Sequence, residues 1–194
     1  MDTTAVFSKK TDHWETPAYI FDPLHEICKF TLDPCADAKT RKCEKFYSPE
    51  DDGLVQSWKG ETVFINPPYS NVYDWISKAY QEYRDNNVTS VLLLPNRSDM
   101  PWFQEHVFHS AIIGFYRKRI KFIPCDGSKV TGAPFPSILM VFSQNVSPDL
   151  ITYLKTVGVV GSLNECNLMR REPEKIIGSY QVTPDSNKWR ELIV

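Results

Sequence analysis

The sequence lacks several features that would assign it directly to a common class of protein. Its 194 residues include five cysteines at scattered positions without a C-x-x-C pair, which disfavours a disulfide scaffold and a structural zinc site. No apolar run approaches the roughly 20 residues that span a bilayer. Residues 1–17 have no apolar stretch after their charges, so no secretory signal is expected. We therefore expect a protein of the reducing cytosol without a membrane partner.

Glycine is also scarce, and its arrangement disfavours the common phosphate-binding loops. The chain has eight glycines, and no two of them form a G-x-G pair. No nucleophile elbow is present, and the four histidines lack the spacing of metal ligands. We therefore predict neither a phosphate loop nor a metal site.

The composition and the charge distribution are more informative. Hydrophobic residues make up 42% and aromatic residues 13% of the chain, which is enough for a packed core. Residues 1–108 carry a net charge of −6, residues 109–145 of +4, and residues 146–194 of 0. The positive charge centres on Arg117, Lys118, Arg119 and Lys121. One basic strip on an acidic body suits a protein that binds a polyanion, although an ordinary solvated strand edge is the alternative.

Apolar runs and helix-start signals alternate along the chain. Strands are expected at 31–33, 63–65, 91–94, 111–116, 119–123 and 137–142, and helices after Thr16-Pro17, Asp22-Pro23, Asn71, Ser98 or Asp99, and Ser147-Pro148. This order predicts an α/β domain with a mainly parallel, twisted sheet and an antiparallel hairpin at its edge. We assign residues 1–145 to this domain and residues 146–194 to a C-terminal extension packed on it.

The most specific motif is Asn66-Pro67-Pro68-Tyr69, directly after the apolar run 63–65. Two prolines stiffen the turn and leave carbonyl groups and the Asn66 side-chain oxygen as hydrogen-bond acceptors. Tyr69 adds a flat ring beside them. Such a site matches a planar group with an NH₂, such as adenine N6, cytosine N4 or a primary amide. The alternative is a proline-rich turn that ends a strand, with Tyr69 merely packed.

This motif resembles the catalytic motif of amino-group methyltransferases that use S-adenosylmethionine. The wider pattern resembles the phage and prophage DNA N6-adenine methyltransferase (Dam-like) family over about residues 14–142. The matching segments are Trp14–Pro17, Leu32–Asp37, Phe46–Leu54, Trp58, Phe64–Ser70, Trp75, Leu93–Pro95, Trp102-Phe103 and Arg119–Phe122. The resemblance implies a class I (Rossmann-like) methyltransferase fold, S-adenosylmethionine as cofactor, and double-stranded DNA as partner in the cytoplasm of a bacterium or bacterial host.

Carried over residue by residue, the resemblance also implies roles for individual positions. The catalytic residues would be Asn66, Pro67, Pro68 and Tyr69, and the cofactor-binding residues Thr16, Pro17, Asp33, Pro34, Cys35, Ala36, Asp37, Asp51, Asp52 and Leu54. The DNA-binding candidates come instead from the charge distribution: Arg117, Lys118, Arg119 and Lys121, with the loop 124–136 and the C-terminal tail as alternatives. One departure is that Cys35-Ala36 stand where many methyltransferases have glycines. S-adenosylmethionine has no phosphate, so a glycine nest is less necessary. Asp51-Asp52 can also be read as a plain acidic turn.

The expected reaction is site-specific methyl transfer to the N6 of an adenine flipped out of DNA. The family name suggests the sequence GATC, which the residues alone do not imply. Two alternatives remain open at this point: a protein-glutamine or RNA amino-methyltransferase with the same motif, and a catalytically silent DNA-binding relative. The oligomeric state is not predicted.

Overall fold

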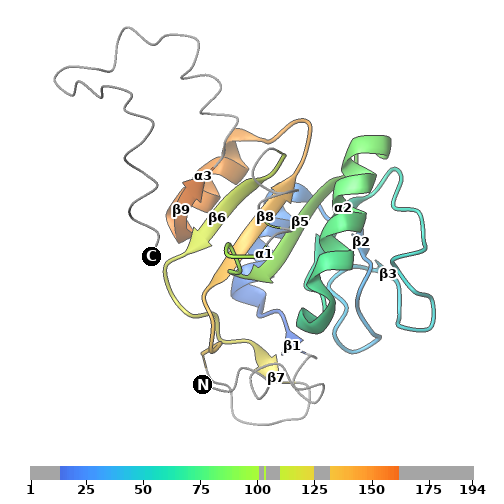
Figure 1. The fold of residues 1–194 in the computed structure, drawn as a ribbon, viewed down its shortest axis with the longest axis horizontal. Helices are drawn as coiled ribbons and strands as arrows, with labels where there is room; N and C mark the ends of the chain where they lie inside the picture. The colour runs from blue at the N-terminus through green and yellow to red at the C-terminus, as the bar shows by residue number, and fades with distance from the viewer. Residues whose placement is uncertain (1–13, 101–102, 104–109, 125–131, 162–194) are drawn as a thin grey trace, which may run out of the picture. The chain divides into compact units, whose positions relative to one another are not determined.

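The computed structural model describes residues 14–100, 103, 110–124 and 132–161, all within one compact unit, Met1–Ser162. The elements in chain order (Figure 1) are β1 (Trp14–Glu15), α1 (Ala18–Cys28), β2 (Leu32–Asp33), β3 (Lys45–Phe46), β4 (Thr62–Ile65), the 3₁₀ turn η3 (Tyr69–Asn71), α2 (Val72–Asn86), β5 (Thr89–Pro95), β6 (Ile112–Tyr116), β7 (Ile123–Pro124), β8 (Ser137–Phe142), α3 (Pro148–Val157) and β9 (Gly158–Gly161).

Seven of these strands form one sheet in the order β3-β2-β4-β5-β8-β6-β9. The strands β3, β2, β4 and β5 are parallel neighbours. In contrast, β8 is antiparallel to both β5 and β6, and β9 is antiparallel to β6. Because two reversals restore the direction, β6 points the same way as β5, and β8 lies reversed between them (Figure 1). The predicted Rossmann-like α/β fold is confirmed, with a mainly parallel sheet that is antiparallel toward one edge.

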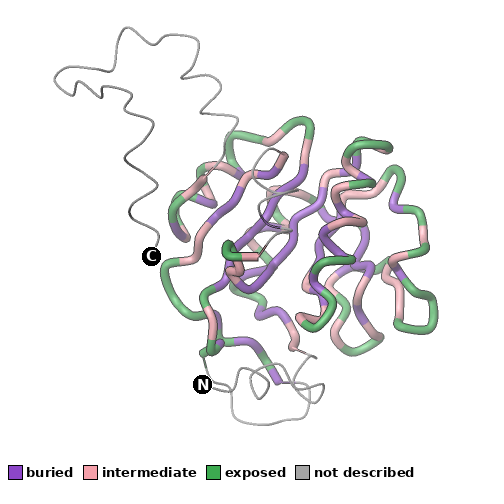
Figure 2. Tube along the Cα trace, viewed as in Figure 1, coloured by how far each residue is buried: buried purple, intermediate pink, exposed green. Residues whose placement is uncertain are grey.

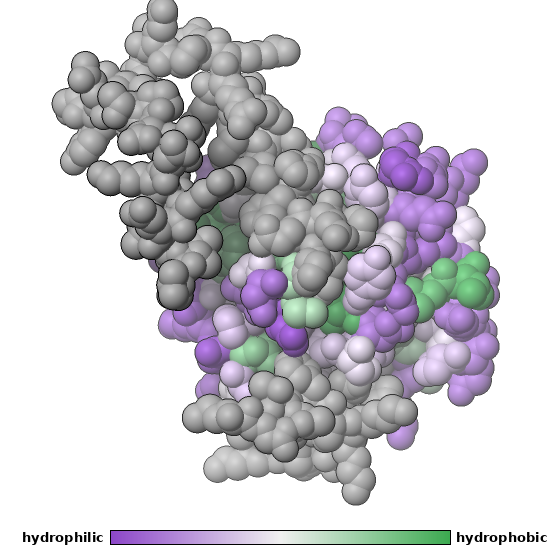
Figure 3. Space-filling view, in the orientation of Figure 1, coloured by the Kyte–Doolittle hydropathy of each residue, from purple (hydrophilic) through white to green (hydrophobic). Residues whose placement is uncertain are grey.

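Helices cover the sheet on both faces, as the continuous apolar run 91–94 predicts for a buried parallel strand. In β5, Leu92 packs into a core cluster with Ile76 of α2. The next residue, Leu93, points to the opposite face and packs with Leu24 of α1 and Leu154 of α3. All five side chains are fully buried, and the central strands are buried along most of their length (Figure 2). On the side seen in Figure 3, the described surface is mostly hydrophilic.

Two local expectations are wrong. Asp22-Pro23 does not start a helix: α1 begins after Pro17, whose carbonyl accepts the N–H groups of Ile20 and Phe21, and Pro23 lies inside it. A proline at this point removes one helical hydrogen bond, which the burial of Ile20 and Leu24 on either side outweighs.

Residues 119–123 do not form a strand of the main sheet. Residues 117–122 are a loop, and only Ile123–Pro124 pairs as β7, with Trp14 and Glu15 of β1 in a separate two-stranded sheet. The alternating pattern has another cause. Ile120 and Phe122 are buried in the core cluster on the α1 and α3 face, while Arg119, Lys121 and Ile123 are exposed. The strand β9 was not foreseen.

At the C-terminal end, the helix expected after Ser147 is confirmed as α3. The Ser147 hydroxyl accepts the Leu150 N–H at 3.2 Å, which caps the first turn. β9 then joins the edge of the sheet, so residues up to Gly161 belong to the same unit. The helix expected after Ser98 or Asp99 lies largely outside the described residues, and residues 162–194 lie wholly outside them. The division of the chain at residue 145 therefore stays a prediction. None of the described helices is long and apolar enough to cross a membrane.

Candidate active site

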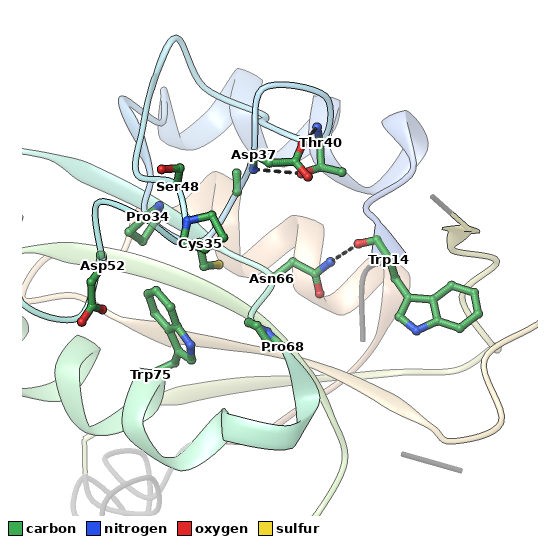
Figure 4. A pocket seen from close by; sticks show the side chains of 13 residues that line it. Trp14, Pro34, Cys35, Asp37, Thr40, Ser48, Asp52, Asn66, Pro68 and Trp75 are labelled. Atoms are coloured by element: carbon green, nitrogen blue, oxygen red, sulfur yellow. Dashed lines mark hydrogen bonds between the residues drawn. The ribbon is translucent and has the colours of Figure 1, made fainter. Parts of the chain in front are cut away.

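A pocket of about 180 Å³ opens where the carboxyl ends of β2 and β4 meet (Figure 4). Parallel strands bring their carboxyl ends to one edge of a sheet, which is where open α/β sheets bind ligands. We call this cavity the Asn66 pocket. Its lining residues are Trp14, Pro34, Cys35, Ala36, Asp37, Thr40, Ser48, Pro49, Asp52, Gly53, Asn66, Pro68 and Trp75.

The side-chain amide of Asn66, directly after β4, is held in one orientation. Its Nδ2 donates a hydrogen bond of 2.8 Å to the main-chain carbonyl of Trp14 in β1 (Figure 4). Because a carbonyl can only accept, this bond requires that the NH₂ end faces β1 and that Oδ1 faces away. Oδ1 accepts the Tyr69 hydroxyl at 3.2 Å, and an amide oxygen has a second lone pair for another donor. The pocket therefore has an oriented acceptor.

The ring of Tyr69 is fixed by other aromatic side chains. It packs edge-on against Phe122, with ring centroids 6.3 Å apart, and against Phe135 at 5.2 Å. Phe122 in turn packs against Trp14 at 6.5 Å. Burial raises the pKa of Tyr69 above its ordinary value, so its hydroxyl stays protonated and can donate to Asn66. The aromatic group thus connects β1 and the loop before β7 to the motif after β4.

Cys35 lies beside Asn66, whose main-chain N–H donates a hydrogen bond to the Cys35 sulfur. Burial raises the pKa of the Cys35 thiol well above its ordinary value, and the nearby Asp33 carboxylate raises it further. A thiol that stays protonated is a poor nucleophile. The Cys35 thiol is therefore suited to packing in the pocket wall and not to nucleophilic attack.

Asp33 organises the loop behind the pocket. Its side chain is buried at 4% exposure, and Oδ2 accepts the main-chain N–H of Lys42 at 3.0 Å. Burial raises the pKa of Asp33 to about 6, although the N–H groups of Lys42 and Cys35 and the Lys42 ammonium lower it. That ammonium forms an ion pair with Glu15 of β1 at 2.9 Å. Asp33 therefore ties the loop after β2 in place, and it lines a cavity of only about 30 Å³.

Two other carboxylates reach the pocket itself. Asp37 accepts the N–H of Lys39 and of Thr40 and lines the pocket wall. Asp52 has a left-handed backbone, with φ of 52°, and is exposed. After it, Gly53 lies so close to Pro34 that a Cβ would sit 2.0 Å from the Pro34 carbonyl oxygen. Glycine is therefore required to bring the Asp52 turn against the loop after β2.

The structure places the predicted cofactor residues in three groups. Pro34, Cys35, Ala36, Asp37 and Asp52 line the Asn66 pocket, and Thr16 and Asp33 line the small cavity beside it. The remaining three do not line the pocket: Pro17 caps α1, Asp51 holds the Ser48 N–H and hydroxyl, and Leu54 packs against the core. Of the motif residues, Asn66 and Pro68 line the pocket, Pro67 is buried, and the half-buried Tyr69 donates its hydroxyl to Asn66.

Six lining residues were not among the predicted site residues: Trp14, Thr40, Ser48, Pro49, Gly53 and Trp75. Trp75 stacks on Trp58 at 6.3 Å and forms a flat apolar wall. All but Thr40 lie in segments that match the family pattern, which was the signal that could have identified them. Within the described residues, no group of three or more His, Cys, Asp or Glu side chains is placed to hold a metal ion.

The four predicted DNA-binding residues lie together at a second cavity. Arg117, Lys118, Arg119 and Lys121 are exposed on the loop after β6, which we call the basic loop. They line a groove of about 520 Å³ with Tyr19, Tyr116, Ile120, Thr156 and Val157. We call it the Tyr19 groove. Since β6 and β4 point the same way, the carboxyl end of β6 lies on the same side of the sheet as the carboxyl end of β4. The groove after β6 and Asn66 after β4 are therefore both at the carboxyl ends of the strands.

Comparison with known proteins identifies the family. A sequence model of the family described as DNA N-6-adenine-methyltransferase (Dam) matches residues 3–164. A DNA N-6-adenine-methyltransferase of Haemophilus phage HP1 is 29% identical over 161 residues, which cover 80% of this chain and 87% of the phage protein. The protein of the same name from Escherichia phage T1 is 36% identical over 96 residues, 48% of this chain and 40% of its own length. The chain therefore belongs to the DNA N-6-adenine-methyltransferase (Dam) family, whose enzymes methylate adenine at N6 in DNA.

Proposed function

We propose that this chain transfers a methyl group from S-adenosylmethionine to N6 of an adenine flipped out of double-stranded DNA, at a specific site. The observation that carries the proposal is the oriented amide of Asn66 in the lining of a pocket at the carboxyl edge of the parallel strands. The family supplies the reaction, since a methyltransferase needs a methyl donor and this family acts on DNA.

The lining of the Asn66 pocket fits S-adenosylmethionine. Trp75, Pro34 and Pro68 offer flat apolar walls for an adenine ring. Asp37 and Asp52 offer carboxylates for ribose hydroxyls or an ammonium group, and the lining within the described ranges contains no lysine or arginine. S-adenosylmethionine carries a sulfonium and an ammonium group and no phosphate, so an acidic pocket without a glycine loop suits it. When bound, it supplies an electrophilic methyl group.

Asn66 and Pro67 would act on the amino group of the target base. The lone pair of N6 is delocalised into the adenine ring, which makes the nitrogen a weak nucleophile. Oδ1 of Asn66 and the carbonyl of Pro67 would accept its two N–H groups, and this would localise the lone pair toward the methyl group. Their contribution is positioning and electrostatic stabilisation. Because the Trp14 carbonyl and the Tyr69 hydroxyl hold the amide, the acceptor needs no reorganisation during the reaction.

The target adenine must leave the duplex because its N6 cannot meet the pocket inside the base stack. Tyr69 would stack on the extruded base and recover about 1–3 kcal/mol of the lost stacking. Its edge-on packing against Phe122 and Phe135 leaves the ring in a fixed orientation for this role.

The basic loop would bind the DNA backbone. Arg117, Lys118, Arg119 and Lys121 are all exposed at the same sheet edge as Asn66. Exposed cations that neutralise phosphates give affinity that does not depend on sequence. The enzyme would act on DNA in the cytoplasm of a bacterium or bacterial host.

Methylation of plasmid DNA tests the proposal. The purified chain is incubated with methyl-labelled S-adenosylmethionine and plasmid, and the digested nucleosides are analysed by mass spectrometry, with sequencing to map the sites. We expect N6-methyladenine at one short sequence. Label that enters RNA or a glutamine-containing protein but not duplex DNA would contradict the proposed substrate, and lack of affinity for the cofactor in calorimetry would contradict the proposed pocket.

A further inference from the structure

The Tyr19 groove combines apolar walls with a cationic rim. Tyr19, Tyr116, Ile120 and Val157 form apolar parts of the lining, and the four cations of the basic loop border it. The described part of the lining contains no aspartate or glutamate. The ion pairs among the described residues are made by Lys29, Lys42, Lys45, Lys78 and Arg84. None of them includes a cation of the basic loop.

Tyr19 is exposed and yet fixed in place. The residue is 58% exposed. Its hydroxyl accepts the main-chain N–H of Lys121 at 3.1 Å, so the phenol is attached to the basic loop rather than free in solvent. Other lining residues are also held in place by hydrogen bonds. The hydroxyls of Tyr116 and Tyr153 are hydrogen-bonded at 3.1 Å, and the Arg117 N–H donates to the Val157 carbonyl.

This combination identifies the chemistry of the ligand. A bare phosphate would be held by the cations and would leave the apolar walls without a partner. An uncharged apolar ligand would leave the cations without one. A nucleotide satisfies both, since every base has a π-face that stacks on an aromatic ring and its phosphate pairs with lysine and arginine.

The position of the groove fits a nucleotide close to the target adenine. From β4, which precedes Asn66, to β6, which precedes the basic loop, the sheet order crosses β5 and β8. Three strand spacings correspond to roughly 14 Å. One strand of duplex DNA rises 3.4 Å per nucleotide, so this separation spans about four nucleotides.

We propose that the Tyr19 groove binds the base of one nucleotide flanking the target adenine, stacked on Tyr19, while the basic loop holds its phosphate. The inference rests on the proposed function and extends it, because the phosphate contacts of the basic loop are independent of sequence. A base held in the groove would give this short chain a contact through which neighbouring sequence is read.

A scan with abasic nucleotides tests the proposal. Short duplexes are built around an adenine that the wild-type enzyme methylates, and each lacks one base within about five nucleotides of the target. Affinity in the presence of S-adenosylhomocysteine and kcat/KM are measured for the wild type and for Tyr19→Ala, Tyr19→Leu and Tyr19→Phe. Tyr19→Leu keeps an apolar side chain without a flat ring, and Tyr19→Phe keeps the ring without the hydroxyl.

We expect one position at which loss of the base weakens the wild type by roughly 5- to 150-fold, the range for loss of a stacked base. On the intact duplex, Tyr19→Ala and Tyr19→Leu should show the same loss. Removing that base should then cost these two variants nothing more, because the two changes remove one interaction. Tyr19→Phe should keep its dependence on that base.

Other results would overturn the inference. If Tyr19→Ala weakens binding equally on every duplex, or not at all, the groove holds no base, while methylation by the wild type would still support the proposed function. If the wild type methylates no duplex, the proposed function fails and the inference fails with it. Thermal unfolding of each variant shows whether a loss reflects the fold instead of the groove, and Tyr19→Leu and Tyr19→Phe keep the test valid if Tyr19→Ala is unstable.

Discussion

The Asn66 pocket and the Tyr19 groove lie at the same edge of one sheet, but their linings carry opposite charge. Among the residues that the structure describes, the pocket has Asp37 and Asp52 and no lysine or arginine, whereas the groove has four cations and no acidic residue. The pocket follows the parallel strands β2 and β4, and the groove follows β6 in the antiparallel part of the sheet. Under the proposed function, this difference would let a chain with a net charge of −2 separate a cationic methyl donor from a polyanionic substrate.

Asn66 lines the pocket and carries the acceptor proposed for the target amino group, so its replacement should have the largest effect. Asn66→Ala removes one positioned acceptor, so we expect kcat to fall by roughly 10²- to 10³-fold, about 2.7–4 kcal/mol. The affinity for S-adenosylmethionine and the salt dependence of DNA binding should stay near those of the wild type. Single-turnover methylation, calorimetry with the cofactor and salt-titrated DNA binding measure these three properties. Near-normal methylation would contradict the mechanism.

Asn66→Asp tests the orientation of the amide more sharply. The second carboxylate oxygen would face the Trp14 carbonyl, which accepts from Nδ2 in the wild type. Repulsion should lower activity by roughly tenfold or more near neutral pH. A protonated carboxyl can donate to the Trp14 carbonyl, and this repulsion should raise the pKa of the new carboxyl. The ratio of variant to wild-type activity should therefore be highest at low pH and fall as the pH rises through that pKa. Parallel pH profiles for the two proteins would show that the Trp14 contact does not matter.

The pocket region also depends on a buried carboxyl group, which should make its stability sensitive to pH. The native pKa of Asp33, about 6, lies above the ordinary value of 3.8, so its stabilising effect is present below about pH 4 and lost as pH rises through 6. Asp33→Asn cannot ionise. Its free energy of unfolding relative to the wild type should therefore rise by up to roughly 3 kcal/mol across this range. Urea unfolding of both proteins measures this difference, and a difference that is constant with pH would refute the prediction.

Asp52→Asn should affect the pocket and leave the groove unchanged. Asparagine tolerates the left-handed backbone at this position, so the turn should be kept. Loss of a hydrogen bond to a charged group should weaken binding of S-adenosylmethionine by about tenfold. The affinity for DNA and its salt dependence should not change. Calorimetry with the cofactor and salt-titrated DNA binding measure the two sides of the comparison, and a change in the DNA curves would show that the regions are not separate.

The smallest effects are expected for single cations of the basic loop. Alanine at Arg117, Lys118 or Lys121 should weaken DNA binding about equally on all sequences and lower the salt slope by about 0.9 for each lost phosphate contact. Cofactor binding should not change. Arg84→Ala is the matched control, because Arg84 is exposed and lies near the C-terminal end of α2, at the opposite edge of the sheet. Unchanged slopes for all three variants would instead favour the C-terminal tail 146–194 as the DNA-binding segment, whose sequence includes Arg170 and Arg171.

Much of the pocket could be predicted because strand ends and prolines are local features. The run 63–65 followed by two prolines places Asn66 at a strand end, and the acidic residues after β2 lie at the same edge. The hydrogen bond from Asn66 to Trp14 could not be predicted, since it joins a side chain to a main-chain carbonyl 52 positions away. A backbone acceptor has no side-chain signature in the sequence.

The groove region was less predictable because tertiary contacts override the local pattern there. Alternation of Ile120 and Phe122 with charged residues is typical of a strand, yet both bury against the core from a loop. The strand β9 reads Gly-Val-Val-Gly, which is short and has glycine at both ends. Its structure depends on pairing with the edge of β6, and the sequence of four residues alone does not indicate that partner.

Because β8 lies between β5 and β6, these two strands cannot be joined into one sheet until Ser137–Phe142 have been synthesised. Until then, the edge of β5 that later pairs from Ser90 to Pro95 has no partner, and its apolar side chains are open to other nascent chains. The residues of the Asn66 pocket have all been made by residue 75, well before their supporting sheet is complete. We expect the growing chain to be most prone to aggregation in this interval, and to depend most on chaperones there.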